Sequence, residues 1–466
     1  MTDVPAARPP SVDRLLSIVL ANGVEVSEPD ALTGLARDVL AEERRRLAVG
    51  APPTPEGDLA EAVEDRLADL DDPLLTIPPH VINATGVLLH TNLGRAPWPR
   101  AARLAAVAAG RSYGYLELDE ATGRRGARFR AAEDHLVALT GAEDAVVVSN
   151  NAAALALAVG LAGRRGSAVV SRGELIEIGG GVRIPEVLGR AGVRLIEVGT
   201  TNRTRAADFE PPLAAGQARV VLRVHPSNFA VSGFAESADL AEVAEIAHRH
   251  GAIVIDDLGS GALLDTASFG LAHEPTPAER LALGADLVLF SGDKLIGGPQ
   301  AGLIVGRRDL VARLRRDPLA RAVRPDKAIL AGVAATLAIY RAGRAVDDIP
   351  IWQMIALGAE PLRVRAEWIL GQAASVAGRT DLSVVDVDSP VGGGSLPGQV
   401  LPSVGVSVPV ASAMRAAAAL RSGPDRILAR IVDGAIVLDL RTVPPFHDGT
   451  IVRRIGGLTK PPKASR

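Results

Sequence analysis

Lys294 is the residue whose position most clearly calls for a chemical explanation. It follows the apolar run ADLVLFS (285–291) and precedes a glycine turn. A lysine at the end of a core strand is costly unless it is paired or used covalently. When such a lysine is desolvated, its amine is held neutral and can form an imine with an aldehyde. A lysine that extends out of the strand end into solvent is the alternative interpretation.

Two acids, Asp256 and Asp257, end another apolar run, GAIVIDD (251–257). A pyridoxal ring acts as an electron sink only while its ring nitrogen stays protonated, and a neighbouring carboxylate enforces that state. We choose Asp256 for this role because it is the first acid after the strand. A metal site or a helix cap would also account for two adjacent acids.

A third apolar run, AVVVS (145–149), leads through Ser149, Asn150 and Asn151 into an Ala/Leu-rich helix. The N–H groups and the dipole at the start of a helix favour a bound phosphate. Ordinary capping of the helix by asparagine gives the same pattern.

The order of these three features along the chain is more informative than any one of them. A phosphate turn, then an acid after a strand, then a lysine 38 residues later is the chain order of fold type I pyridoxal 5′-phosphate enzymes. We therefore expect Lys294 to carry this cofactor, Asp256 to contact its ring nitrogen and the turn at 149–151 to bind its phosphate.

Seven apolar runs rich in β-branched residues alternate with Ala-rich helical stretches between about residues 80 and 305. The runs are AVVVS, SAVVS, VRLIEVG, RVVLRVH, AIVIDD, ADLVLFS and GLIVG. This alternation predicts an α/β domain with a mainly parallel sheet, in which ligands gather at the carboxyl ends of the strands. The strands should therefore bring the polar residues that follow them together.

Changes in composition and in the pattern of apolar residues along the chain predict three domains. Residues 1–75 read as amphipathic helices, with a Pro/Gly-rich stretch at 49–57, and residues 76–330 form the cofactor-binding α/β core. Residues 331–466 form a smaller α+β domain with strands SVVDVD and AIVLDL and the loop PVGGGSLPGQVLP.

Composition and charge exclude some kinds of functional site and indicate others. The 466 residues include no cysteine, which excludes disulfides, thiolate metal sites and cysteine nucleophiles, and we expect no metal. With no signal pattern and no apolar stretch of about 18 residues, we expect a cytoplasmic protein without membrane contact.

Residues 1–75 carry 7 basic and 16 acidic residues, whereas 307–327 carry 8 basic and 3 acidic residues. The basic stripe indicates a polyanionic ligand or, alternatively, a solvated helix face.

Six longer segments together resemble the bacterial selenocysteine synthases, the L-seryl-tRNA(Sec) selenium transferases. The segments are INATGVLLHTNLGRAPW (82–98), YGYLELDEATGRRGARF (113–129), SRGELIEIGGGVRIPEVL (171–188), EVGTTNRT (197–204), HPSNFAVSGF (225–234) and SGDKLIGGPQAG (291–302). The resemblance runs from about residue 80 to GGGSLPGQVLP. It implies a fold type I transferase that converts seryl-tRNA(Sec) with selenophosphate to selenocysteinyl-tRNA(Sec) through an aminoacrylyl intermediate.

The resemblance also assigns roles to particular residues. The active-site arginines of the family match Arg95, Arg321 and Arg324, which would hold the selenophosphate dianion. Lys294, once freed, would carry the proton at Cα.

Further candidate site residues follow from residue types and their positions near the predicted strand ends. Asp293 would orient or tune the Lys294 amine. Ser291 would donate to the phosphate, and Asn228 would reach the phenolic oxygen of the cofactor. Thr200 and Thr201 would donate to the substrate or, alternatively, act as local caps.

His90 and His225 could act as general bases, but histidines at strand ends of such domains are more often structural hydrogen-bond partners or ring-stacking groups. The helical N-terminal segment is consistent with the family's tRNA-binding extension, and the family is expected to assemble from dimers, as a homodecamer. Two other functions compete with this interpretation: a pyridoxal-phosphate ammonia lyase acting on a small amino-sugar acid phosphate, and a non-catalytic RNA-binding scaffold.

Overall fold

The computed structural model describes residues 8–26, 28–72, 77–125, 128–163, 165–227, 229 and 233–460. The chain divides into two compact units between His80 and Val81. Asn228, expected at the cofactor, lies outside the described residues. No helix in the described part of the chain has the length and apolar character needed to span a bilayer.

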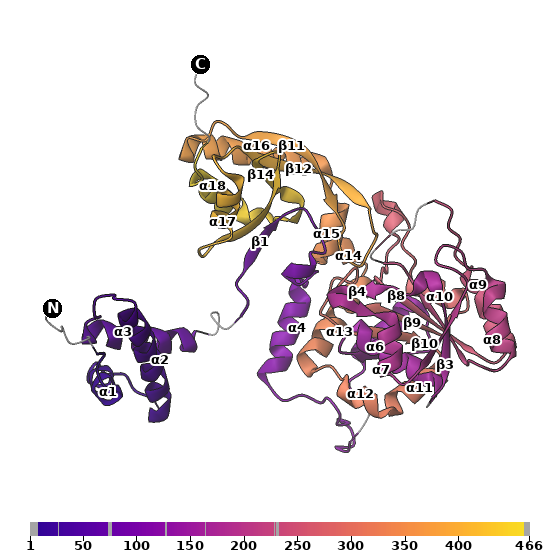
Figure 1. The fold of residues 1–466 in the computed structure, drawn as a ribbon. Helices are drawn as coiled ribbons and strands as arrows, with labels where there is room; N and C mark the ends of the chain where they lie inside the picture. The colour runs from indigo at the N-terminus through magenta and orange to yellow at the C-terminus, as the bar shows by residue number, and fades with distance from the viewer. Residues whose placement is uncertain are drawn as a thin grey trace. The chain divides into compact units, whose positions relative to one another are not determined.

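The N-terminal unit contains three helices: α1 (Val12–Ala21), α2 (Pro29–Ala48) and α3 (Glu56–Asp71). Ser11 caps α1 by accepting a hydrogen bond from the Arg14 N–H. The apolar stripes of the helices meet in one small core around Leu15, Leu40 and Leu59. The unit therefore has a core of its own. Figure 1 shows α1, α2 and α3 beside one another.

A seven-stranded sheet forms the centre of the second unit (Figure 1). Its strand order is β2-β10-β9-β8-β7-β3-β6, and only β10 runs antiparallel to its neighbours. The strands are β2 (Asp144–Val148), β3 (Ser167–Ser171), β6 (Arg194–Val198), β7 (Val220–Val224), β8 (Ile253–Gly259), β9 (Leu287–Ser291) and β10 (Gly302–Gly306). All seven predicted runs are strands of this sheet, and the predicted α/β fold with a mainly parallel sheet is confirmed.

Helices cover both faces of this sheet, as the connections between parallel strands require. One face packs against α6 (Asn151–Val159), α7 (Ile184–Arg190) and α11 (Arg308–Arg316). The other packs against helices that include α5 (Ala131–Thr140), α9 (Leu240–Arg249) and α13 (Lys327–Arg341). The strands are buried on both sides, which explains why their sequences are continuously apolar.

A second sheet of five strands has the order β1-β13-β14-β12-β11. Its strands are β1 (Val81–Ala84), β11 (Ser383–Pro390), β12 (Val400–Val408), β13 (Arg426–Val432) and β14 (Ala435–Asp439). It packs with α16 (Ala359–Ala377), α17 (Ala413–Leu420) and α18 (Asp448–Gly456). The segment that begins the expected core domain thus contributes β1 to the C-terminal sheet, where β1 pairs in parallel with β13.

The chain that leaves β1 is fixed against the loop between β11 and β12. The Leu88 and Leu89 N–H groups donate to the carbonyl oxygens of Pro390 and Val391, at 3.1 and 2.7 Å. Gly86 has φ +76°, and a Cβ there would lie 1.9 Å from Asp439 Oδ2, so only glycine allows this approach. These contacts hold the β11–β12 loop next to the segment that leads to Arg95.

Candidate active site around Lys294

The side chain of Lys294 faces a cavity of about 300 Å³, which we call the Lys294 cavity. Its lining comes from the carboxyl ends of β7, β8 and β9, the start of α6, the 91–95 segment and the β11–β12 loop. Lys294 is 9% exposed, and its amine makes no hydrogen bond or ion pair with any described residue. Burial and the charge of Arg95 lower its pKa, although Asp257 and Asp293 act in the opposite direction. The solvent-extended alternative for Lys294 is therefore wrong.

Asp257, not Asp256, is the acid in the Lys294 cavity. Its carboxylate accepts a 2.7 Å hydrogen bond from the Asn151 side-chain amide, and burial raises its pKa to about 6. Asp256 is fully buried and receives two hydrogen bonds from Arg280, at 2.5 and 3.2 Å. The choice of Asp256 assumed that the strand ended before the acids. Strand β8 continues to Gly259, so the pleat turns consecutive side chains to opposite faces.

The start of α6 lines one end of the Lys294 cavity. Asn150 caps the helix by accepting a 2.9 Å hydrogen bond from the Ala153 N–H. The N–H groups of Asn151 and Ala152 donate to no described residue, and both residues line the cavity. Ser149 does not line it, and its N–H is bonded to the Val323 carbonyl at 2.8 Å. Of the predicted turn, Asn150 and Asn151 are at the cavity.

Arg95 and Asp293 form an ion pair on the wall of the Lys294 cavity. The Arg95 Nη1 atom lies 2.9 Å from Asp293 Oδ2. Arg95 has φ +64°, a left-handed conformation that costs about 1 kcal/mol for a residue with a Cβ atom. Ser291 also lines the cavity, and its side chain is buried. The predicted grouping of these three residues with Lys294 agrees with their positions.

Arg321 and Arg324 do not reach the Lys294 cavity of this chain. They line a second cavity of about 610 Å³, which we call the arginine cavity and which Arg128 and Arg315 also line. Arg324 pairs with Glu117, and Arg128 lies 3.1 Å from the same carboxylate. This separation was not visible in the sequence.

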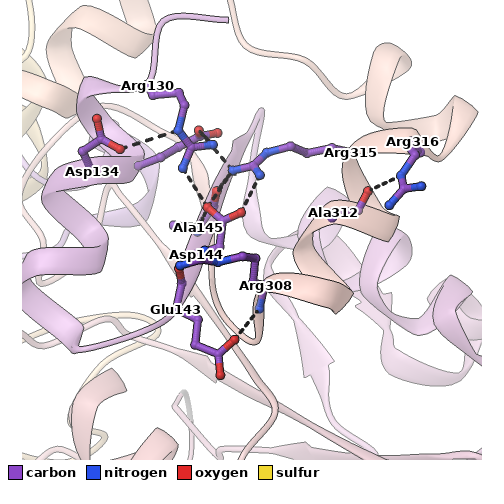
Figure 2. Close-up of polar contacts among 10 residues, drawn as sticks. Arg130, Asp134, Glu143, Asp144, Ala145, Arg308, Ala312, Arg315 and Arg316 are labelled. Atoms are coloured by element: carbon purple, nitrogen blue, oxygen red, sulfur yellow. Dashed lines mark hydrogen bonds and ion pairs between the residues drawn. The ribbon is translucent and has the colours of Figure 1, made fainter. Parts of the chain in front are cut away.

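Arg315 is anchored rather than solvated. Figure 2 shows Arg130 and Arg315 converging on Asp144. Their guanidinium nitrogens lie 2.6 to 2.9 Å from the oxygens of its carboxylate. Asp144 begins β2 and Arg315 lies in the last turn of α11, so this cluster ties the basic run to the sheet. Glu133 contacts both arginines. Burial raises the pKa of Glu133 to about 7, because its effect is larger than the lowering caused by the charges of Arg315 and Arg130. A solvated helix face is thus the wrong description for Arg315.

Thr200 and Thr201 line a third cavity, of about 540 Å³, together with Asp256 and Arg280. The Thr200 hydroxyl donates to the Arg203 carbonyl at 3.0 Å and accepts from the Arg203 N–H at 3.2 Å. These two hydrogen bonds form a local turn, in agreement with the alternative interpretation of Thr200 as a local cap. The two threonines are not at the Lys294 cavity.

Sequence reasoning missed several residues of the Lys294 cavity. His225, which was not chosen as a site residue because a structural or ring-stacking role was favoured, lines it and lies 3.4 Å from Glu274. Gly393 and Gly394 reach the cavity from the C-terminal sheet. The glycine run was visible in the sequence, but its contact with a lysine about one hundred residues earlier was not. No cluster of three or more possible metal ligands occurs among the residues that the structure describes.

Comparison with known proteins places these features in a family. Residues 81–444 match the family model described as L-seryl-tRNA selenium transferase. The L-seryl-tRNA(Sec) selenium transferase of Moorella thermoacetica is 43% identical over 451 residues, which cover 96% of this chain and 95% of that protein. The protein of the same name from Rhizobium meliloti is 45% identical over 442 residues, which cover 93% of each chain.

A solved structure shares the fold at lower sequence identity. The D-glucosaminate-6-phosphate ammonia-lyase has a TM-score of 0.57 and 22% identity, covering 81% of this chain and 96% of that one. This likeness supports the fold type I architecture alone. The family match and the two close relatives, each aligned over more than nine-tenths of the chain, lead to one conclusion: the chain belongs to the L-seryl-tRNA selenium transferase family.

Proposed function

We propose that this chain uses pyridoxal 5′-phosphate to convert seryl-tRNA(Sec) and selenophosphate into selenocysteinyl-tRNA(Sec). The observation that carries the proposal is the buried, unpaired amine of Lys294, which shares one cavity with Asp257 and the open start of α6. The family supplies the reaction, and this cavity supplies the groups that the reaction needs.

The lining residues fit the cofactor chemically. An unpaired amine suits an aldehyde carbon, a buried carboxylate suits a ring nitrogen, and free helix N–H groups suit a phosphate. The buried Oδ1 atom of Asn151 also has no partner among the described residues. We assign Lys294 to the aldehyde, Asp257 to the ring nitrogen, and Asn150, Asn151 and Ser291 to the phosphate end. When bound, the cofactor supplies an electron sink for the charge left at Cα.

Lys294 and its neighbours would move the proton. A lysine whose pKa is lowered by burial is neutral at a lower pH than a free lysine, so its amine can accept the Cα proton. Asp293 holds Arg95 beside that amine, and the positive charge of Arg95 helps to keep the amine neutral. Arg95 would also attract the selenophosphate anion.

We place Arg321 and Arg324 at the site of a second subunit. In this chain they line a cavity apart from Lys294, and fold type I enzymes build their sites between two subunits. Their guanidinium groups would then hold selenophosphate across a dimer interface. We also propose that such dimers assemble into a homodecamer.

The N-terminal unit would bind the tRNA. It has a core of its own, and Arg44 and Arg45 are exposed near the end of α2. The unit is acidic, so contacts with phosphates would be few and shape would contribute more of the recognition. We also propose that the protein is cytoplasmic, because its proposed substrate is a tRNA.

The decisive experiment is incubation of the purified protein with seryl-tRNA(Sec) and selenophosphate. We expect selenocysteinyl-tRNA(Sec), and we expect borohydride reduction to trap the cofactor on Lys294. If no selenocysteinyl product forms while an amino-sugar acid phosphate is deaminated, the ammonia-lyase function is correct instead. If the protein binds tRNA but carries no cofactor, the scaffold function is correct.

A further inference from the structure

Glu274 is a buried acid with an unbonded carboxylate oxygen. The residue is 3% exposed, and its Oε1 atom accepts no hydrogen bond from any residue that the structure describes. A buried oxygen without a donor costs free energy, and native proteins contain few such groups. The position of this carboxylate therefore calls for an explanation.

The Oε1 atom of Glu274 lies 3.4 Å from Nε2 of His225. This separation exceeds the about 2.7 to 3.2 Å of an ordinary N–H···O hydrogen bond. Hydrogen bonds of active sites are often long while the ligand is absent and shorten when it binds. An ionised carboxylate can only accept, so the contact requires a neutral His225 to carry its proton on Nε2. Glu274 therefore selects one tautomer of His225 and one orientation of its ring.

The backbone on both sides of this pair is fixed by hydrogen bonds. The Glu274 N–H donates at 2.8 Å to the hydroxyl of Thr266, a fully buried residue. That hydroxyl donates to the Ala272 carbonyl at 2.6 Å. The His225 N–H donates to the Asp257 carbonyl at 3.0 Å, which continues the pairing of β7 with β8. The side-chain torsions of His225 are therefore the main freedom left to the pair, and Glu274 restricts them.

His225 connects Glu274 to the Lys294 cavity. It lines both that cavity and the third cavity, whereas Glu274 lines neither. Burial raises the pKa of Asp257 to about 6, and the charge of His225 opposes this rise. Burial lowers the pKa of Lys294, and the charge of Glu274 opposes that change. The pair thus acts on both groups between which we place the cofactor.

We infer that Glu274 is a positioning residue of the active site, which holds the His225 imidazole by its Nε2–H against the bound cofactor beside Asp257. His225 contacts the cofactor, and Glu274 acts through His225. The inference rests on the proposed function and adds to it a residue that touches neither the substrate nor the cofactor.

The test is a double-mutant cycle on the cofactor-loaded protein, with seryl-tRNA(Sec) and selenophosphate as substrates. Glu274→Leu should lower kcat about tenfold, leave KM for seryl-tRNA(Sec) unchanged and shift the cofactor absorption band. Glu274→Gln, whose amide oxygen can accept from Nε2, should lower kcat by only about threefold. In the His225→Asn background, Glu274→Leu should have no further effect, because the group that it positions is gone.

Two substitutions of His225 provide a check that leaves the buried acid in place. His225→Gln puts an amide nitrogen near the position of Nε2 and keeps a donor for Glu274, whereas the shorter His225→Asn does not. The glutamine variant should therefore retain about threefold more activity than the asparagine variant. This difference should vanish in the Glu274→Leu background.

A second glutamate–histidine pair, on the surface, is the matched control. His273 Nε2 lies 3.1 Å from Glu279 Oε2, and both side chains are 47% exposed. His273→Asn and Glu279→Gln, alone and together, should leave kcat and the cofactor absorption band unchanged. A shift of the band in these variants would mean that the band does not report on His225, and the inference would lose its support.

The outcomes separate the positioning role from the proposed function. If Glu274→Leu lowers kcat equally with and without His225, or leaves both kcat and the band unchanged, the positioning role is wrong while the proposed function stands. If the wild-type protein forms no selenocysteinyl-tRNA(Sec), the proposed function is wrong. The absorption band needs no turnover, so an unshifted band in Glu274→Leu would still overturn the positioning role in that case.

Discussion

The Asn151 side chain donates a 2.7 Å hydrogen bond to the Asp257 carboxylate, which joins the first turn of α6 to the end of strand β8. The hydrogen bond thereby holds the start of this helix next to a buried acid. Both lie at the carboxyl edge of the sheet, where Lys294 follows β9. Long-range contacts of this kind make the site a property of the fold rather than of one segment.

Asp257→Asn should impair the cofactor site far more than Asp256→Asn. The first change removes the charge in the Lys294 cavity, so we expect kcat to fall at least about 100-fold with a shifted cofactor band. The second leaves the partly buried Arg280 without its charged partner and should lower the free energy of unfolding by about 3 kcal/mol. Absorption spectra, steady-state kinetics and urea unfolding separate the two effects.

The pH dependence of cofactor binding gives a further check on Asp257. Burial raises its pKa to about 6, so the carboxyl becomes protonated as the pH falls through 6 and no longer attracts a protonated ring nitrogen. Cofactor affinity, measured by fluorescence titration, should weaken below pH 6. An affinity that stays constant from pH 7 to pH 5 would contradict the assignment.

Lys294→Met should abolish activity and yet stabilise the cofactor-free protein. An unpaired buried amine costs about 1 kcal/mol or more, which a methionine of similar size avoids. The folded-state pKa of Lys294 is lowered, so the unfolded chain binds more protons and the stability of the wild-type protein should rise with pH up to the unfolded pKa near 10.5. This rise should be reduced in Lys294→Met. Lys460→Ala, at an exposed position, serves as the control.

Glu133 should destabilise the protein increasingly as the pH rises from 4.5 to 7. Its pKa is raised from 4.5 to about 7, so the folded state holds a proton that the unfolded state has lost, and the fold loses stability across this window. Glu133→Gln should remove that slope and raise the free energy of unfolding at pH 8 by about 1 to 3 kcal/mol. Asp144, in the same cluster (Figure 2), behaves oppositely, because Arg315 and Arg130 lower its pKa. Equal slopes for wild type and Glu133→Gln in urea unfolding would count against this account.

The sequence predicted the large sheet well because its strands are buried on both faces and are therefore continuously apolar. It predicted the C-terminal sheet poorly, because β12 and β13 mix apolar residues with serine, glycine, proline and arginine. At the site, the chain order identified Lys294, Asn150 and Asn151, but choosing between Asp256 and Asp257 required the exact end of β8. The positive φ of Arg95, the separate cavity of Arg321 and Arg324, and the approach of Gly394 to Lys294 all depend on tertiary contacts that leave no local pattern.

Mixing two inactive variants should restore activity if Arg321 and Arg324 act in a second subunit. One variant is Lys294→Ala, and the other is the double variant Arg321→Ala/Arg324→Ala. Since these arginines line a cavity apart from Lys294, a mixed dimer should contain one complete site, built from Lys294 of one subunit and the arginines of the other. We expect the co-refolded mixture to reach about a quarter of wild-type activity, because half of the dimers are mixed and each mixed dimer has one intact site of two. The control mixes Lys294→Ala with Asp257→Asn, two changes within one cavity, which should not restore activity. Failure of the first mixture, with assembly verified by sedimentation, would show that Arg321 and Arg324 do not act in a second subunit.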